Sequence, residues 1–204
     1  ETFCGAQVFN SDLSKWDVSK VTTLEYTFSK AVVFISDLSK WDVAKVTIMT
    51  DTFSGENHGG RGSVGPTAFN SDLSKWVVSK VTTFHGTFQA AHAFNSDLSK
   101  WDVSKVTRFP HIFDGAQAFN SDLSKWDVSK VISANQMLSN SAFKQGTWCS
   151  QRWSLFTDIR LPVGNRVLCC NAGSHLKVDV DPLSTGVGHG WFSINNVWEF
   201  AANW

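Results

Sequence analysis

The sequence predicts an α/β repeat solenoid, in which short parallel strands and helical turns stack along one axis and end in an irregular C-terminal cap. Three observations predict this fold. A unit of 25 residues recurs five times, its first half alternates polar with apolar residues, and its second half spaces apolar residues three to four positions apart. One strand and one helical turn cannot bury an inner face alone, so we expect each copy to bury it against its neighbours.

Each copy begins with a close match to the run F-N-S-D-L-S-K-W-D-V-S-K-V-T. The five copies span residues 9–33, 34–68, 69–93, 94–118 and 119–142. One tryptophan recurs at the same position: Trp16, Trp41, Trp76, Trp101 and Trp126. One aspartate does the same: Asp12, Asp37, Asp72, Asp97 and Asp122. A Gly-rich insertion at 56–67 lengthens the second copy outside the run, where a repeat stack accepts loops.

The chain opens inside a repeat, because Thr2-Phe3 aligns with the Thr-Phe pairs of the later copies. We therefore expect a partial first repeat and a true N-terminus further upstream. The absence of a signal or transit peptide then carries no information about localisation.

Within the first copy, the alternation of Ser14-Lys15-Trp16-Asp17-Val18 predicts a half-buried strand. From Val21 to Ala31 the apolar spacing predicts a short helix or helical turn. The expected core of this copy consists of its apolar set: Leu13, Trp16, Val18, Val21, Leu24 and Phe28.

The run, followed by an apolar turn that ends in Thr-Phe, resembles the BspA-like leucine-rich repeat of bacterial and protist surface proteins over residues 1–143. That family often has Met where Leu24, Phe84 and Phe109 stand here, a difference that leaves these positions hydrophobic. The resemblance implies a leucine-rich-repeat solenoid, often at a cell surface, with a role in adhesion or protein binding. It leaves the function open, because proteins of one fold serve diverse functions.

The second predicted region, residues 144–204, matches no repeat and is expected to cap the stack or to dock on another protein. Its aromatic side chains suit a cover for the apolar end of the stack: Trp148, Trp153, Phe156, Trp191 and Phe192. The tail from Trp198 to Trp204 is alternatively an anchor on a partner. The segment from His175 to Pro182 alternates like a strand that ends at a proline.

The cysteines Cys4, Cys149, Cys169 and Cys170 lie outside the full repeats and form no C-x-x-C pair. A disulfide, free thiols and simple packing all remain open. A metal site formed by the C-terminal cysteines, histidines and aspartates is a less favoured alternative to a cap.

If the copies stack in register, recurring charged residues form exposed columns along the stack. One column is Lys15, Lys40, Lys75, Lys100 and Lys125. The next is Asp17, Asp42, Val77, Asp102 and Asp127, in which Val77 interrupts the acidic row. Mutual compensation explains the opposite columns without a ligand, and a binding face for a charged partner is the alternative. The candidate partner-binding residues are these two columns with Arg61, Trp198 and Trp204.

Composition and motifs point away from catalysis. The six histidines are scattered, no G-x-S-x-G elbow occurs, and the insertion lacks the G-K-[ST] ending of a phosphate loop. We therefore predict no catalytic residue, no cofactor and no metal. Lys plus Arg and Asp plus Glu each total 18, so no net charge attracts nucleic acid, and no apolar stretch is long enough to cross a bilayer.

These observations favour a non-enzymatic protein-binding or scaffold module that presents a repeat surface, in cell-surface recognition or adhesion. The alternative is a structural subunit of a larger assembly, docked through the insertion and the Trp-rich tail. An enzyme in the C-terminal segment is the most distant alternative. A cell-surface or secreted location follows from the resemblance alone, and an organelle lumen remains open.

Overall fold

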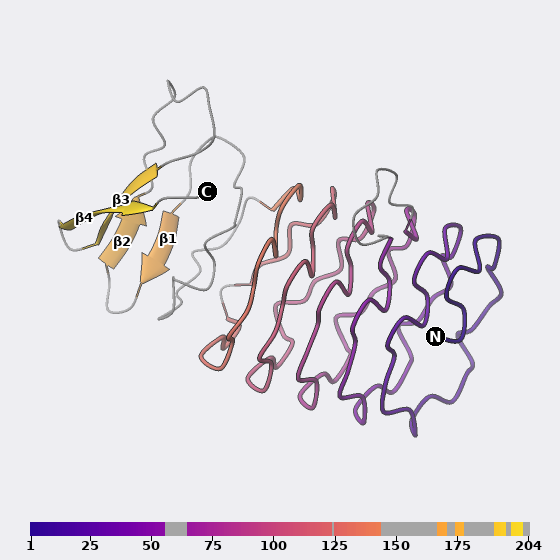
Figure 1. The fold of residues 1–204 in the computed structure, drawn as a ribbon. Helices are drawn as coiled ribbons and strands as arrows, with labels where there is room; N and C mark the ends of the chain where they lie inside the picture. The colour runs from indigo at the N-terminus through magenta and orange to yellow at the C-terminus, as the bar shows by residue number, and fades with distance from the viewer. Residues whose placement is uncertain are drawn as a thin grey trace.

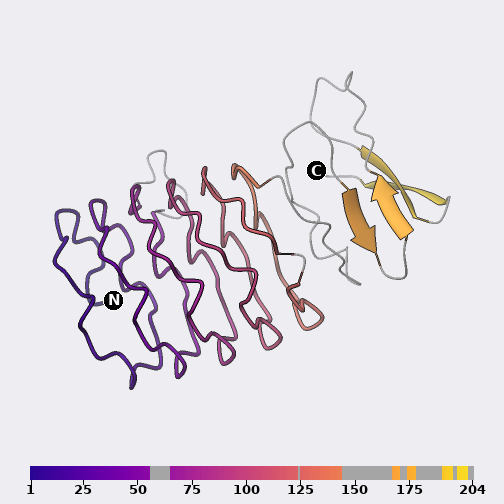
Figure 2. The same ribbon diagram turned by 180° about the vertical axis from the view of Figure 1, so that it is seen from behind.

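The computed structural model describes residues 1–55, 65–123 and 125–143, and the backbone of four strands near the C-terminus. In the repeat region the chain runs as successive coils that lie side by side along one axis (Figure 1, Figure 2). The coils are joined by backbone hydrogen bonds at equivalent positions. Thr47 N–H donates to the Thr22 carbonyl and Thr82 N–H to the Thr47 carbonyl, both at 2.9 Å. One 25-residue repeat is therefore one coil of the stack.

The expected α/β architecture is wrong. The described part of the chain contains no helix, and its repeat region pairs β-fashion only through isolated parallel bridges, one residue per coil. The bridged residues are Thr23, Ile48, Thr83, Arg108 and Ser133. A stack of coils joined by single bridges and turns has no layers of strands and helices. The α/β form of the leucine-rich-repeat fold, which the resemblance implies, is therefore wrong as well.

Two β-turns replace the strand predicted at residues 14–18. The Trp16 N–H donates to the Leu13 carbonyl at 3.0 Å, and the Val21 N–H donates to the Val18 carbonyl at 2.9 Å. The first turn exposes Lys15, while Leu13 and Val18, the residues at which the two turns begin, are buried. The polar and apolar alternation thus comes from turn geometry, which places polar central residues outward between buried flanking residues.

Consecutive β-turns also replace the predicted helical turn. Some N–H groups cross to the next coil, as Phe28 N–H donates to the Thr52 carbonyl at 2.8 Å. The N–H groups between them close turns inside the coil, as Thr27 N–H donates to the Leu24 carbonyl at 3.0 Å. Tyr26 has a φ of 53°, which lies outside the right-handed helical region. The apolar spacing of three to four residues therefore reflects repeated turns.

The core is built from two columns of fully buried phenylalanines that run along the stack. They are Phe28, Phe53, Phe88 and Phe113 in one column and Phe34, Phe69, Phe94 and Phe119 in the other. Within a coil the rings of Phe88 and Phe94 lie 3.9 Å apart, and between coils those of Phe94 and Phe119 lie 6.2 Å apart. Stacked aromatic rings at these separations add to the stabilisation from apolar burial.

The predicted core set is confirmed for Leu13, Val18, Leu24 and Phe28, which are buried, and Val21 packs against them partly buried. Trp16 differs, with 50% of its surface exposed. The same tryptophan in later copies is 3–5% exposed: Trp41, Trp76, Trp101 and Trp126.

Each buried tryptophan bonds to the coil before it. The Trp101 Nε1–H donates to the Leu73 carbonyl at 3.0 Å. The Leu73 N–H in turn donates to Ser96 Oγ, in the same coil as Trp101, at 2.8 Å. One leucine is therefore held on both sides by the next copy, and equivalent bonds recur between the other neighbouring coils.

Asparagine side chains form a further ladder. The Asn95 N–H donates to Asn70 Oδ1, and the Asn120 N–H donates to Asn95 Oδ1, both at 2.8 Å. Ile35 stands at this position in the second copy and has no acceptor to continue the ladder. Its side chain is 55% exposed.

Near the C-terminus, β1 (Val167–Cys170) pairs antiparallel with β2 (Ser174–Lys177), and β3 (Gly190–Ile194) pairs antiparallel with β4 (Val197–Ala201). β2 covers the start of the strand expected from His175 onward, and positions 178–182 lie outside the described residues. The capping or docking role of 144–204 stays a prediction, because its side chains are not described.

Candidate functional site

The structure exposes both predicted columns of candidate binding residues. Lys15, Lys40, Lys75, Lys100 and Lys125 are all exposed, as are Asp17, Asp42, Val77, Asp102 and Asp127. The lysines and aspartates do not pair with each other. In the described residues an ion pair joins His111 to Asp114, and neither belongs to a column. Compensation between opposite columns therefore does not occur through direct ion pairs.

The aspartates at both recurring positions of the run stabilise turns. Asp102 Oδ1 accepts the Ser104 N–H at 3.1 Å, and Asp97 Oδ1 accepts the Ser99 N–H at 2.9 Å. Hydrogen bonds from Ser104 hold the pKa of Asp102 below its ordinary value of 3.8. The first aspartate of the run acts in the same way, because Asp12 accepts the Ser14 N–H at 2.8 Å.

Val77 is the one member of its column without a carboxylate, and 55% of its surface is exposed. No side-chain acceptor is available there for the turn that Asp102 closes in the next copy. The substitution removes a local hydrogen bond and adds exposed apolar surface on the third coil.

The remaining predicted candidates are not tested by geometry. Arg61 and Trp204 lie outside the described residues. Trp198 belongs to β4, whose backbone alone is described.

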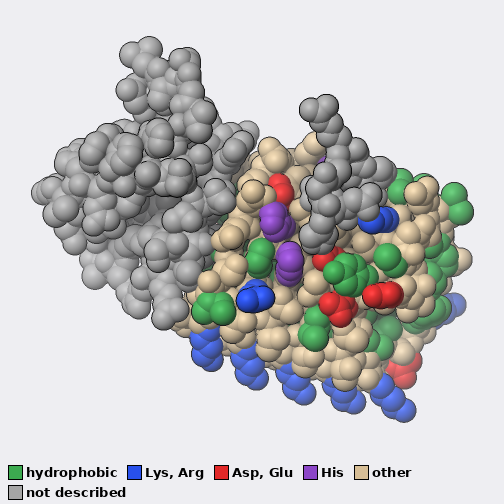
Figure 3. All heavy atoms as spheres, in the orientation of Figure 1, with side chains coloured by type: hydrophobic (Ala, Val, Ile, Leu, Met, Phe, Trp, Pro, Cys, Tyr) green, Lys and Arg blue, Asp and Glu red, His purple; other side chains and the backbone are tan. Residues whose placement is uncertain are grey.

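A different surface gathers the side chains that vary between copies. We call it the variable wall. It consists of the side chains of residues 23–30, 48–55, 83–90, 108–115 and 133–140 that lie outside the hydrophobic core. At one turn position every copy has a positive φ: Tyr26, Asp51, Gly86, His111 and Gln136. The backbone is therefore constant along this column while the side chain changes from copy to copy. Figure 3 shows histidine, acidic and apolar side chains intermixed on one face of the stack.

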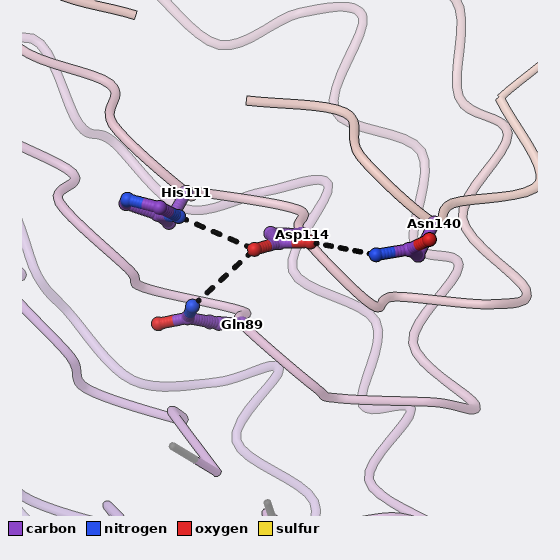
Figure 4. A network of polar contacts seen from close by, with 4 residues as sticks. All are labelled: Gln89, His111, Asp114 and Asn140. Atoms are coloured by element: carbon purple, nitrogen blue, oxygen red, sulfur yellow. Dashed lines mark hydrogen bonds and ion pairs between the residues drawn. The ribbon is translucent and has the colours of Figure 1, made fainter. Parts of the chain in front are cut away.

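A polar network at the centre of the wall joins three coils through Asp114 (Figure 4). Asp114 Oδ2 lies 3.2 Å from His111 Nδ1 and accepts a bond from Gln89 Nε2 at 3.5 Å. Asp114 Oδ1 accepts a bond from Asn140 Nδ2 at 3.4 Å. The His85 and His111 rings are stacked with centroids 6.0 Å apart. The network holds His111 in a fixed orientation beside His85.

Asp51 lies next to this network and is only 3% exposed. Its Oδ2 atom is buried without a hydrogen-bond partner. A Cβ at residue 86 would collide with the Asp51 carboxylate, so Gly86 leaves the room that this side chain occupies. Burial raises the pKa of Tyr26 above 10.0, and the negative charge of Asp51 raises it further.

The wall has the chemistry of a contact surface. The described residues hold no group of three or more His, Cys, Asp or Glu side chains placed to share a metal ion. Within the same stretches no helix has the length and apolarity that crossing a bilayer requires. Cys4, on the first coil, is exposed and unpaired.

Sequence reasoning singled out charged columns and missed the wall. The signal that could have found it is the contrast inside each copy. The run F-N-S-D-L-S-K-W-D-V-S-K-V-T recurs, while most of the next eight residues change apart from a Thr-Phe pair that several copies keep. Variation on a repeated backbone marks the positions that the stack leaves free to differ.

A family model described as "Mycoplasma protein of unknown function, DUF285" matches residues 1–58 and 64–152. No curated protein and no solved structure matches the chain. The matched residues cover all of the coils and most of the described chain.

Proposed function

The chain belongs to the family described as Mycoplasma protein of unknown function, DUF285, and from this premise we propose that it is a non-enzymatic protein-binding or scaffold module. In this proposal the repeated run builds the framework and the variable wall contacts the partner. The likeness of the repeats to BspA-like surface repeats supports a place at the cell surface, in recognition or adhesion.

The observation that carries the proposal is the division of labour within each copy. In the repeated run, the Trp, Ser, Asn and Asp side chains bond the backbone of their own or a neighbouring coil. In the wall, side chains of different chemistry occupy equivalent backbone positions, as His111 and Gln136 do. A rigid scaffold that presents varied side chains is how repeat proteins form extended binding surfaces.

The polar network supports a recognition role for the wall. Interface side chains bind best when neighbouring contacts hold them in place before the partner arrives, because less conformational entropy is then lost. Asp114 holds His111 and Asn140 in this way. Tyr26, partly buried on the same wall, adds an aromatic side chain of the kind enriched at interface hot spots.

The test is native mass spectrometry of the protein isolated gently from its source, with crosslinks mapped to residues. We expect a partner protein crosslinked to the wall. A variant with Arg108→Ala and Gln136→Ala, both exposed wall positions, should lose that partner. The matched control, with Gln7→Ala and Gln117→Ala, changes exposed positions away from the wall and should retain it.

Crosslinks confined to the 56–67 insertion and the Trp-rich tail would contradict this proposal. They would favour the alternative, a structural subunit docked into a larger assembly. Equal loss of the partner in the wall variant and its control would also contradict it.

A further inference from the structure

Lysines of the repeated run form two exposed columns, and together they define what we call the lysine ridge. The first column is Lys15, Lys40, Lys75, Lys100 and Lys125. The second column is Lys20, Lys45, Lys80, Lys105 and Lys130. All ten are exposed, and Figure 3 shows basic side chains projecting in a row from one edge of the stack.

These lysines attract nearby turn carboxylates through space, as Lys45 attracts Asp17, without direct contact in the described residues. None of them forms an ion pair with a described carboxylate. The run contains nine aspartates in all. Seven of them accept a hydrogen bond from the backbone N–H two residues later at 2.8–3.0 Å, and Asp102 accepts the equivalent bond at 3.1 Å. The carboxylates are held at the backbone, while the lysine ammonium groups remain available to solvent.

The invariance of the lysines is not explained by recent duplication alone. The wall residues of the same copies have diverged, and the run itself has changed to Ile35, Val77 and Ile132 at positions where the usual side chain bonds the backbone. Neither lysine position has changed in any copy. The stack has therefore kept the charged side chains that do not hold it together.

Repulsion between neighbouring lysines of one column opposes the attraction that the nearby aspartates exert on them. Hydrogen-bonded coils are about 4.8 Å apart, and two like charges at that spacing in water repel by roughly 0.8 kcal/mol before salt screens them. A chain of negative charges laid along the ridge would remove this repulsion and release bound counterions.

The chemistry beside the lysines selects among polyanions. Each ridge lysine follows a serine, or Ala44 in one copy, so hydroxyl groups accompany the ammonium groups. The four later tryptophans are 3–5% exposed and offer no face for nucleobase stacking. Apart from Val77, and Trp16 beside Lys15 in the first copy, the turns that carry the lysines present no large apolar side chain for a bilayer to receive.

We propose that the lysine ridge binds an extended acidic polysaccharide along the axis of the stack. Carboxylate or sulfate groups that recur along the glycan meet successive lysines, and its hydroxyls meet the adjacent serines. The site lies on the repeated run and is independent of the variable wall, so either surface can fail its test without the other.

The experiment measures binding of the full chain to dextran sulfate, with neutral dextran, inorganic polyphosphate and duplex DNA as comparison ligands. We expect saturable binding to dextran sulfate that weakens steeply between about 50 mM and about 200 mM salt. Binding to neutral dextran should be absent. Stronger binding to polyphosphate or to DNA would overturn the assignment to a polysaccharide.

Two charge-matched variants locate the site. Lys75→Gln with Lys100→Gln removes two ridge charges, and we expect about tenfold weaker binding to dextran sulfate. Gln7→Glu with Gln117→Glu makes the same change in net charge at exposed positions outside the ridge and the wall, and should change binding less than twofold, about the scatter of such measurements. Thermal unfolding followed by tryptophan fluorescence checks that both variants fold. Equal weakening by both, or no binding at low salt, would overturn the proposal.

Discussion

The repeated run and the variable wall share one backbone and use their side chains differently. In the run, the tryptophan, serine and asparagine side chains join one coil to the next, as Trp101 does through the Leu73 carbonyl. In the wall, the joins between coils are mainly backbone hydrogen bonds, such as Gly86 N–H to the Pro110 carbonyl at 2.8 Å. Positions whose side chains hold the stack repeat, and positions held by backbone are free to vary.

This difference teaches that repetition and function need separate explanations. The recurring aspartates and serines satisfy the backbone and need no ligand to account for them. The lysines recur without such a bond, and the exposed side chains of the wall differ from copy to copy. These two sets are therefore where binding is to be sought.

The largest expected effect compares one tryptophan with its equivalent in the first copy. Trp101→Phe removes the bond from Nε1 to the Leu73 carbonyl and leaves a small void, so we expect a loss of about 1–2 kcal/mol in the free energy of unfolding. Trp16→Phe alters a half-exposed side chain and should cost less than about 0.5 kcal/mol. Urea denaturation measures both, and similar losses would break the link between recurrence and coil-to-coil bonding.

Acid titration tests the turn carboxylates of the run. Hydrogen bonds from Ser99 keep the pKa of Asp97 below 3.8 in the folded protein, so the folded state binds fewer protons than the unfolded state near that pH. The stability contributed by Asp97 is therefore complete above its unfolded pKa and is lost as pH falls through its folded pKa. The free energy of unfolding should decrease between about pH 5 and about pH 2, and less steeply in Asp97→Asn. An unchanged pH dependence in that variant would contradict the turn-stabilising role.

Restoring the recurring aspartate at position 77 should stabilise the stack. Val77→Asp supplies an acceptor for the N–H of Ser79, as Asp102 does for Ser104 at 3.1 Å. Repulsion from the aspartates of the neighbouring coils offsets part of the gain, so we expect about 0.5 kcal/mol. Chemical denaturation measures the change, with Val77→Asn as the uncharged control. A loss of stability in both variants would show that Val77 contributes packing that the run lacks elsewhere.

The smallest expected effect on stability lies in the wall. His111→Gln removes a partly exposed contact with Asp114, and should change the free energy of unfolding by less than about 0.5 kcal/mol. The same variant should weaken partner capture, because His111 belongs to the network that holds wall side chains in place through Asp114. Full retention of the partner would remove His111 from the contact surface.

The core was predictable from sequence because burial depends on which side chains recur. Leu13, Val18, Leu24 and Phe28 recur as apolar residues, and the structure buries them. The strand and the helical turn were not predictable from the same residues. A β-turn also separates buried residues by two or three positions, so its apolar pattern imitates both elements.

The sequence by itself determined the period of the stack, the position of the insertion and the apolar side chains that form the core. It did so because each copy must bury the same face against the next one. Only the tertiary structure decided how the backbone closes each coil and which polar side chains meet. Gln89, His111, Asp114 and Asn140 come from three copies, and the stacking of those coils is what brings them within hydrogen-bond distance.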